Sequence, residues 1–510
     1  MEQIMSDVKS VGFFVNGKNL KSKTKEFYDI YDPNIGEVIA KAPRCTKDEV
    51  NMAVEAARKA YPGWRDIPVL KRVQVLFAFK KLIEDNIDDL THTVCMENGK
   101  VWGEAKGDVL KAIEVVELAC GTPSLMMGQS LMDTSVNYDT VLYREPLGVF
   151  VGLVPWNFPA MIPFGWMVPL CIATGNTMVL KASSTTPMTA LKMIELLHQA
   201  GLPNGVVNVV TASRKEAEIF LTHPDVKGIT FVGSMSVGKH IYSTAAAHGK
   251  RVQALCEAKN HCLVLEDAPI ERTAAGIVNA TYGCAGERCM ALPVVVVQES
   301  IADELVASIK EKAKERFLGP AYDKKSELGP VVTAKHKQFV MDWIETGIKE
   351  GAELILDGRD AVVPGYENGF WLGPTIFDHV KPGMTVGDEE IFGPVTSIKR
   401  VKDFEEGLAV MNANQFANGS AIYTQNGYYS REFAKRTHAG MVGINVGIPV
   451  PVGMSPFSGH KNSFFGDLHV MGFDGIRFYT ETKCVTTHWF DEEEMIQVKV
   501  DTWDGTIGEI

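Results

Sequence analysis

Short apolar runs alternate with amphipathic stretches along most of the chain, and this alternation predicts its elements. The runs at 149–154 and 177–180 are uncharged and rich in residues typical of buried strands. Two further strands are expected at 206–210 and 228–232, with helices at 187–200 and 236–248. Strands that alternate with helices in this way predict a parallel sheet covered by helices on both faces.

Two other regions complete the predicted architecture. The spacing of apolar residues predicts a helix over 47–60, which Pro62 would end. A second alternation of strands and helices runs from 261 past 440, including a buried strand at 293–297 and an amphipathic helix at 301–317. We therefore expect an α/β protein with two α/β lobes.

One long uncharged stretch could be mistaken for a membrane span. Residues 147–180 contain no charged side chain. Four prolines and two glycines interrupt the stretch, and a lipid-exposed helix could hardly absorb so many breaks. We interpret it as a buried strand, a loop, an interior helix and a second buried strand, with no membrane partner.

Composition and charge narrow the functional classes. The chain has 510 residues and a formal net charge of −12, which argues against general binding to nucleic acid or anionic membranes. Its nine cysteines show no disulfide-like or zinc-ligand spacing, so no metal site is expected. The first ten residues do not resemble a signal peptide. Unpaired thiols and the lack of a leader together predict a cytoplasmic location.

The segment around Cys289 carries the strongest chemical signal. Glycines and alanines surround this thiol, and Arg288 directly precedes it. A nucleophilic cysteine needs a lowered pKa, which an adjacent guanidinium or a helix N-terminus can supply. A buried structural cysteine is the alternative, and it would be preferred if this segment stood alone.

Four other segments place polar or aromatic groups near predicted strand ends. Asn157 follows the strand at 149–154, and its amide could donate to a developing oxyanion. Lys181 ends the next strand, within reach of a ribose or a phosphate. The 233–238 segment opens a helix at which backbone N–H groups could hold a phosphate. Glu390 and Phe392 could contact a ribose and a nicotinamide. Each of these residues could equally be an ordinary loop or strand-end residue.

Taken together and in this order, the segments resemble the aldehyde dehydrogenase superfamily over roughly residues 10–490. The resemblance implies a Rossmann-like cofactor domain (1–124 and 148–257), an α/β catalytic domain (258–470) and β segments for oligomerisation (125–147 and 471–510). It implies that Cys289 attacks an aldehyde and that Asn157 and the Cys289 amide form the oxyanion hole. It also implies a cofactor site for NAD or NADP, made by Val154, Pro155, Trp156, Lys181, Ser184, Gly233, Ser234, Val237, Glu390 and Phe392. Cys284 is interpreted as non-catalytic.

The branch within the superfamily follows from what is missing. Many members carry a glutamate that activates water, and here that position is Leu255, which cannot act as a base. The segments 258–261, 285–291 and 466–469 resemble methylmalonate-semialdehyde dehydrogenases, a branch that passes its acyl group to coenzyme A (CoA). That resemblance implies a small anionic aldehyde, such as malonate or methylmalonate semialdehyde, held by Arg288, Lys111 and Phe158.

Three residues depart from that branch. Lys111 stands where a second arginine is usual, so the charge is kept but the bidentate fork is lost. Ser184 stands where NAD-preferring members often carry a glutamate, which leaves room for the 2′-phosphate of NADP. Glu257 replaces a glycine and could be a displaced catalytic carboxylate or simply a solvated or ion-paired side chain.

Two rival functions remain open on the sequence alone. One is a hydrolytic NAD(P)-dependent dehydrogenase of another anionic aldehyde, such as succinate semialdehyde or a sulfonated aldehyde. The other is a binding or structural protein on the same fold, which the presence of Cys289, Asn157, Lys181 and Glu390 disfavours. The resemblance further implies a homodimer or homotetramer, with 137–144 and 482–488 as the intersubunit strands.

Overall fold

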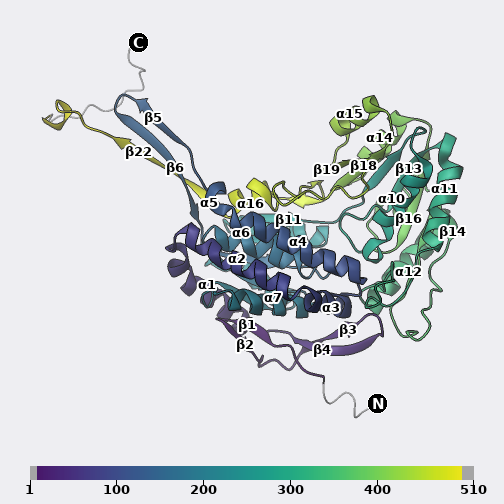
Figure 1. Ribbon diagram of the computed structural model, residues 1–510, viewed down its shortest axis with the longest axis horizontal. Helices are drawn as coiled ribbons and strands as arrows, with labels where there is room; N and C mark the ends of the chain where they lie inside the picture. Colours follow the sequence, from purple (N-terminus) through teal and green to yellow (C-terminus); the bar gives the residue numbers. More distant parts are fainter. Residues whose placement is uncertain (1–7, 497–510) are drawn as a thin grey trace.

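The computed structural model describes residues 8–496 and has two α/β lobes with a projecting arm (Figure 1). The first lobe is built on an eight-stranded sheet in the order β2-β1-β9-β8-β7-β10-β11-β21. Its strands are β2 (Lys18–Leu20), β1 (Phe13–Val15), β9 (Val207–Val210), β8 (Thr177–Lys181), β7 (Val149–Leu153), β10 (Val226–Val232), β11 (Arg251–Leu255) and β21 (Phe464–Phe465). The five strands from β9 to β11 are mutually parallel, as predicted, and the outer pairings are antiparallel.

The central strands are buried on both faces, which explains why their sequences are uniformly apolar. In β7, Phe150 packs into one hydrophobic cluster while Val149 and Val151 pack into another on the opposite side. Helices cover the first face as α2 (Val69–Asp85), α4 (Trp102–Cys120), α6 (Val168–Ala173) and α7 (Met188–Gln199). The second face is covered by α1 (Lys47–Arg65), α8 (Arg214–Thr222) and α9 (Met235–Ala247). Helix α3 (Ile87–Asn98) lies between α2 and α4 in the sequence.

The predicted end of the first helix at Pro62 is wrong. Helix α1 continues to Arg65 with Pro62 inside it. A proline removes only the hydrogen bond that its own N–H would donate, and Pro62 lies in the last turn. The Asp66 N–H donates to the Pro62 carbonyl (3.2 Å), so the turn closes beyond the proline.

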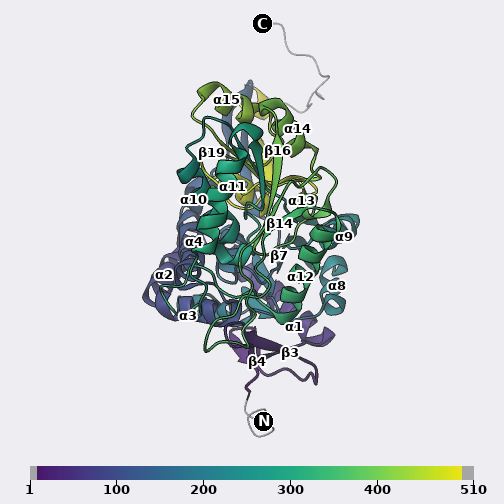
Figure 2. The ribbon, with the colours of Figure 1, turned by 90° about the vertical axis from the view of Figure 1, so that its right-hand side faces the viewer.

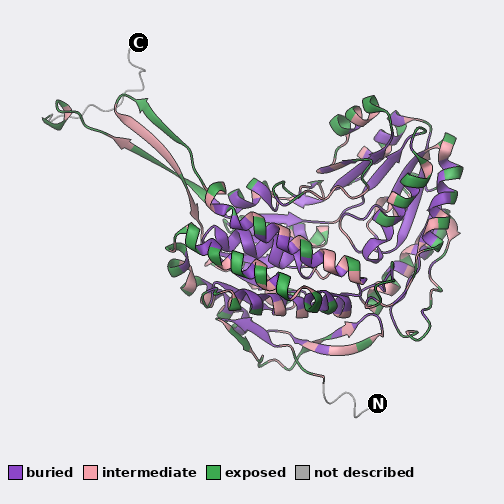
Figure 3. Cartoon of the chain, in the orientation of Figure 1, coloured by how far each residue is buried: buried purple, intermediate pink, exposed green. Residues whose placement is uncertain are grey.

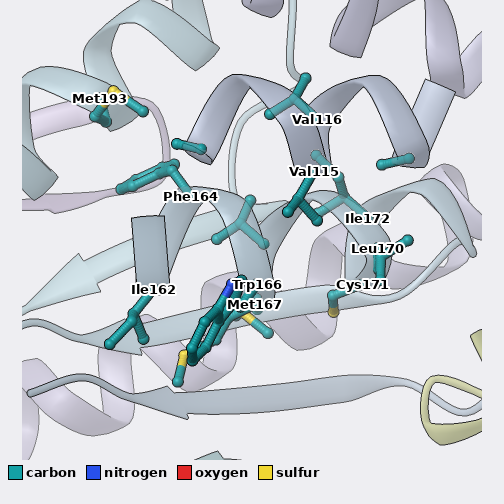
Figure 4. Close-up of a cluster of buried hydrophobic side chains, with 14 of the residues drawn as sticks. Val115, Val116, Ile162, Phe164, Trp166, Met167, Leu170, Cys171, Ile172 and Met193 are labelled. Carbon is teal, nitrogen blue, oxygen red and sulfur yellow. The ribbon is translucent and has the colours of Figure 1, made fainter. Parts of the chain in front are cut away.

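The uncharged stretch folds into the interior of the first lobe. Between β7 and β8 it forms a π-helix at Ile162–Met167 that leads directly into α6. Both helices carry a proline in their first turn, where a missing N–H costs little. Figure 4 shows Phe164, Trp166 and Met167 from this segment packed with α4 side chains such as Val115. Among residues 8–496, no helix has the length and apolar character needed to cross a membrane.

The second lobe holds a seven-stranded sheet in the order β14-β15-β16-β13-β12-β18-β19. Its strands are β14 (Glu353–Leu356), β15 (Thr375–Asp378), β16 (Val395–Val401), β13 (Val294–Gln298), β12 (His261–Val264), β18 (Gly419–Tyr423) and β19 (Met441–Ile444). Its helices are α10 (Ile270–Tyr282), α11 (Glu299–Lys314), α12 (Ala334–Lys349), α14 (Phe404–Ala413) and α15 (Gly427–Arg436). The views of Figures 1 and 2 place this lobe beside the first, so loops of both lobes meet between them.

Three strands form an arm that leaves the body of the molecule. Strand β6 (Tyr138–Pro146) pairs with β5 (Ser130–Ser135) on one side and with β22 (Thr480–His488) on the other. Most of the arm is exposed or half-buried (Figure 3), including large apolar side chains such as Met132 and Val485. The strand predicted at 482–488 lies within β22, which begins two residues earlier at Thr480. The part of the predicted oligomerisation segment 471–510 beyond residue 496 lies outside the described residues.

Candidate active site

Cys289 lies on an irregular segment between α10 and β13, and this segment begins with an unusual backbone turn. Cys284, Ala285 and Gly286 are all left-handed, with φ values of 51°, 53° and 74°. Non-glycine residues pay about 1–3 kcal/mol each for this conformation unless their surroundings hold it. Glu104, in the first turn of α4, provides such support because its Oε2 accepts the Cys284 N–H (2.8 Å).

The Cys289 backbone is fixed from the opposite side. Its carbonyl accepts hydrogen bonds from the side-chain amides of Asn260 (2.9 Å) and Asn418 (3.1 Å). Its thiol is half-buried and borders two cavities, one of about 400 Å³ and one of about 260 Å³. Cys289 is thus reached from two directions. We call the larger one the aldehyde-side cavity and the smaller one the cofactor-side cavity, after the roles that the family resemblance implies for their residues.

The possibility that Arg288 lowers the pKa of Cys289 finds no support in the hydrogen bonds of its guanidinium. The Arg288 guanidinium turns away and donates from Nε to Cys284 Sγ (3.1 Å) and from Nη2 to Glu104 Oε1 (2.8 Å). Burial, followed by the charge of Glu390, raises the pKa of Cys289 to about 12. The resting thiol is therefore protonated, and its activation needs a base or a change in its surroundings.

Asn157 lines the cofactor-side cavity together with Cys289, in the loop that follows β7. Its side chain is buried, and Nδ2 donates to the Glu287 carbonyl (3.1 Å). An amide nitrogen carries two hydrogens, so one N–H remains for a substrate oxygen. Together with the Cys289 N–H, this geometry is compatible with the predicted oxyanion hole.

The aldehyde-side cavity brings together all three predicted substrate residues. Arg288, Lys111 and Phe158 line it, with a largely apolar remainder that includes Met161, Trp166, Met290, Ile448, Val450 and Phe457. Lys111 Nζ forms an ion pair with Glu114 (2.6 Å), as Arg288 does with Glu104. Both cationic side chains of this cavity therefore already have a carboxylate partner. A guanidinium has five N–H donors, which leaves Arg288 free donors for a further anion. Sequence reasoning missed Glu104, since no local signal pairs it with a residue 184 positions away.

The cofactor-side cavity collects six of the predicted cofactor residues: Pro155, Trp156, Gly233, Ser234, Glu390 and Phe392. Glu390 accepts the Ala258 N–H (2.9 Å), and burial raises its pKa to about 8. The Phe392 ring meets Trp156 edge-on at 5.4 Å. Ser234 is the N-cap residue of α9 but makes no side-chain capping bond. The Met235 N–H faces the Glu257 carboxylate, and the other first-turn N–H groups keep their capacity for an anion.

A third cavity of about 200 Å³ continues from the first lobe's strand ends. Three predicted cofactor residues, Val154, Lys181 and Val237, line it. Burial lowers the pKa of Lys181 to about 8, because its ammonium is desolvated. Arg214, which sequence reasoning missed, adds a second basic side chain. Ser184 is half-buried and does not line any of these three cavities.

Comparisons with known proteins agree with this geometry. The sequence profile described as "Aldehyde dehydrogenase family" matches residues 20–485. Malonate-semialdehyde dehydrogenase 3 of Geobacillus kaustophilus is 47% identical, over 95% of this chain and 100% of that protein. Malonate-semialdehyde dehydrogenase 1 of Oceanobacillus iheyensis is 45% identical, over 96% of this chain and 100% of its own.

Solved structures give the same result for the fold. The crystal structure of a putative methylmalonate-semialdehyde dehydrogenase from Sinorhizobium meliloti, complexed with NAD, superposes with a TM-score of 0.93 at 39% identity. The match covers 95% of this chain and 99% of that one. Methylmalonate-semialdehyde dehydrogenase from Oceanimonas doudoroffii also matches with a TM-score of 0.93, at 39% identity and the same coverage. The predicted fold and family resemblance are confirmed.

Proposed function

Because this chain belongs to the aldehyde dehydrogenase family, we propose that it oxidises a small anionic semialdehyde of the malonate or methylmalonate type. The acyl group would form a thioester on Cys289 and then pass to CoA. The observation that carries this proposal is the position of Cys289 between two cavities. One cavity holds cations for an anionic aldehyde, and the other has the lining of a dinucleotide site.

The residues of the cofactor-side cavity and of the third cavity fit NAD. Lys181, which lines the third cavity, is half-buried, and desolvation lowers the pKa of its ammonium to about 8. The first turn of α9 offers N–H groups without a side-chain cap, and Gly233 has no room for a Cβ because Phe231 lies 2.6 Å from that position. These features suit ribose hydroxyls and a pyrophosphate. When bound, NAD supplies the hydride acceptor.

The protein's own residues then perform three tasks. Arg288 and Lys111 hold the anionic end of the aldehyde in the aldehyde-side cavity. The Cys289 sulfur, once deprotonated, adds to the carbonyl carbon. Asn157 Nδ2 and the Cys289 N–H donate to the oxygen as it becomes negative, a contribution typically worth about 3–4 kcal/mol per donor. When the adduct collapses, its carbon loses the hydride, and the acyl group remains on the Cys289 sulfur as a thioester.

Leu255 supports CoA rather than water as the acceptor of the acyl group. This residue ends β11 and is buried, and it has no group that could take a proton from water. A thiol has an acidic proton of its own, with a pKa near about 8.5, so it needs less assistance. Ping-pong kinetics follow from the covalent intermediate.

A substrate panel tests the proposal. Malonate, methylmalonate and succinate semialdehydes and a sulfonated aldehyde are each assayed with NAD or NADP, with and without CoA. We expect malonate-type semialdehydes to give a burst of reduced cofactor without CoA and steady turnover only with it. Full turnover of another anionic aldehyde without CoA would instead support the hydrolytic alternative, which Lys111 in place of an arginine favours.

The setting of the enzyme is part of the proposal. All nine cysteines are free, which supports work in a reducing compartment such as the cytoplasm. The arm exposes apolar side chains on β5 and β22, a feature that supports assembly into a homodimer or homotetramer.

A further inference from the structure

Glu257 is the one acidic side chain of the cofactor-side cavity for which the proposed chemistry has no use so far. It follows β11 by two residues, on the same strand end as Leu255. Its backbone is held firmly: the Cys256 N–H donates to the Ser463 carbonyl (2.8 Å), and Ser463 Oγ donates to the Glu257 carbonyl (2.7 Å). Cys256 also packs against Gly238, where a Cβ would lie 2.2 Å from its sulfur. The side chain of Glu257 therefore leaves a rigid support.

The surroundings of Glu257 suit a group that exchanges a proton. It is half-buried and lines the same cavity as Cys289, Glu390 and His336. Burial raises the pKa of Glu257, the Met235 N–H opposes that change, and the charge of Glu389 adds to it. The charge of Glu257 in turn raises the pKa of Glu390. Glu257, Glu390 and the Cys289 thiol therefore share one cavity, and their charges influence one another there.

The positions of the two cavities determine the direction from which the acceptor thiol can approach the acyl group on Cys289. After hydride transfer, the acyl group attached to Cys289 occupies the aldehyde-side cavity. A nucleophile must then approach from the cofactor-side cavity, once the reduced cofactor has left it. That route passes Glu257, a half-buried carboxylate that lines this cavity and that, unlike Glu390, has no role in the proposed cofactor site.

Building on the proposed function, we propose that Glu257 is the general base of the acyl-transfer step. Its carboxylate takes the proton from the incoming thiol. The thiolate sulfur forms a bond to the acyl carbon, the bond from that carbon to Cys289 Sγ breaks, and Cys289 leaves as a thiolate. No electrons are gained or lost in this step, and the proton on Glu257 returns to solvent. Glu257 thus supplies from a different position the base that Leu255 lacks.

A competing role for Glu257 is confined to the cofactor. Its carboxylate faces the Met235 N–H in the first turn of α9, where a cofactor phosphate would also bind. In that role Glu257 would alter only cofactor affinity. The two roles are separable, because one acts after the reduced cofactor has formed and the other before.

The experiment compares Glu257→Gln, Glu257→Asp and a matched control, Glu389→Gln, in the full-length enzyme. Glu389 is the neighbouring carboxylate, and it bonds to Gln415 (2.7 Å) rather than lining the cofactor-side cavity. Stopped-flow absorbance measures the burst of reduced cofactor with NAD and malonate semialdehyde. Mixing the isolated acyl-enzyme with CoA then measures acyl transfer alone.

We expect Glu257→Gln to slow acyl transfer by about 100-fold at neutral pH, the usual contribution of a general base, while the burst rate stays near that of the wild type. The remaining rate should rise with pH until the thiol of CoA is ionised, near about pH 8.5. Glu257→Asp should recover part of the rate, and Glu389→Gln should behave as wild type.

Two results would overturn the assignment. One is normal acyl transfer in Glu257→Gln together with a changed affinity for NAD, which would leave Glu257 with the cofactor role only. The other is an equal loss in Glu389→Gln, which would indicate a general electrostatic effect. If the wild-type enzyme itself shows no burst, or no dependence on CoA, the proposed function fails first and independently.

Discussion

Replacing Glu104 by glutamine separates the two roles that its carboxylate has beside Cys289. One carboxylate oxygen accepts a hydrogen bond from the Cys284 N–H, and the other accepts one from Arg288 Nη2. Both donor–acceptor distances are 2.8 Å. Glutamine offers a single carbonyl oxygen, so it can serve one of these donors. We expect it to keep the backbone N–H, because that group is buried and has no other acceptor, and to release Arg288.

The magnitude follows from the contacts. Hydrogen bonds to charged groups contribute about 1.5–3 kcal/mol each, and partial exposure of this ion pair reduces its share. We expect Glu104→Gln to lose about 1–2 kcal/mol of stability. The unpaired charge of Arg288 then becomes available to an anionic substrate. A gain of about 1.4 kcal/mol would lower the KM for that substrate about tenfold.

The assay measures KM at saturating NAD and CoA for malonate semialdehyde and for a neutral aldehyde of equal length. The neutral aldehyde controls for distortion of the left-handed turn. Glu104→Ala is a second control, since it removes both acceptors and should lower kcat as the turn loses its support. If Glu104→Gln changes KM equally for both aldehydes, Arg288 does not recognise the anionic group, and its proposed role in substrate binding is refuted.

Three further outcomes are expected. Cys289→Ala should abolish both the burst and turnover, whereas Cys284→Ser should retain the burst, as measured by stopped-flow absorbance; the reverse pattern would exchange their roles. Leu255→Glu should introduce CoA-independent turnover, detected as steady reduced cofactor without CoA, because it supplies the carboxylate that many members of the family carry at this position. A variant whose fold is intact by circular dichroism but which still needs CoA would contradict this. Ser184→Glu should lower kcat/KM for NADP at least about tenfold relative to NAD, through repulsion of the 2′-phosphate.

Features that depend on local pattern could be predicted from the sequence. The strands of the first sheet are uniformly apolar because both of their faces are covered, and parallel strands place their carboxyl ends at one edge. Asn157, Lys181 and Ser234 follow such strands and do line the cavities found there. A single sequence therefore indicated which residues would gather, without any of their contacts.

Contacts between distant segments could not be predicted. The partner of Arg288 lies on α4, and that ion pair turns the guanidinium away from Cys289. The effect of Arg288 on the pKa of the Cys289 thiol depends on where the guanidinium points. The adjacency of the two residues in the sequence does not specify this direction. The continuation of α1 past Pro62 similarly depends on the last turn and on the burial of Trp64 against the first sheet's helices. In both places tertiary contacts outweighed a local rule.

The charges on the two sides of Cys289 imply an order of events. On the aldehyde side, Arg288 and Lys111 each form an ion pair with a carboxylate. These ion pairs hold the two side chains in place and leave only part of their positive charge to attract an anionic substrate. On the cofactor side, Glu257 brings negative charge to the cavity proposed for the dinucleotide, whereas burial raises the pKa of Glu390 to about 8. In the proposed mechanism the anionic phosphates bind against the charge of Glu257, which favours release of the reduced cofactor after hydride transfer. Release in turn opens the route past Glu257, so one carboxylate both speeds the departure of the cofactor and accepts the proton of the thiol that replaces it.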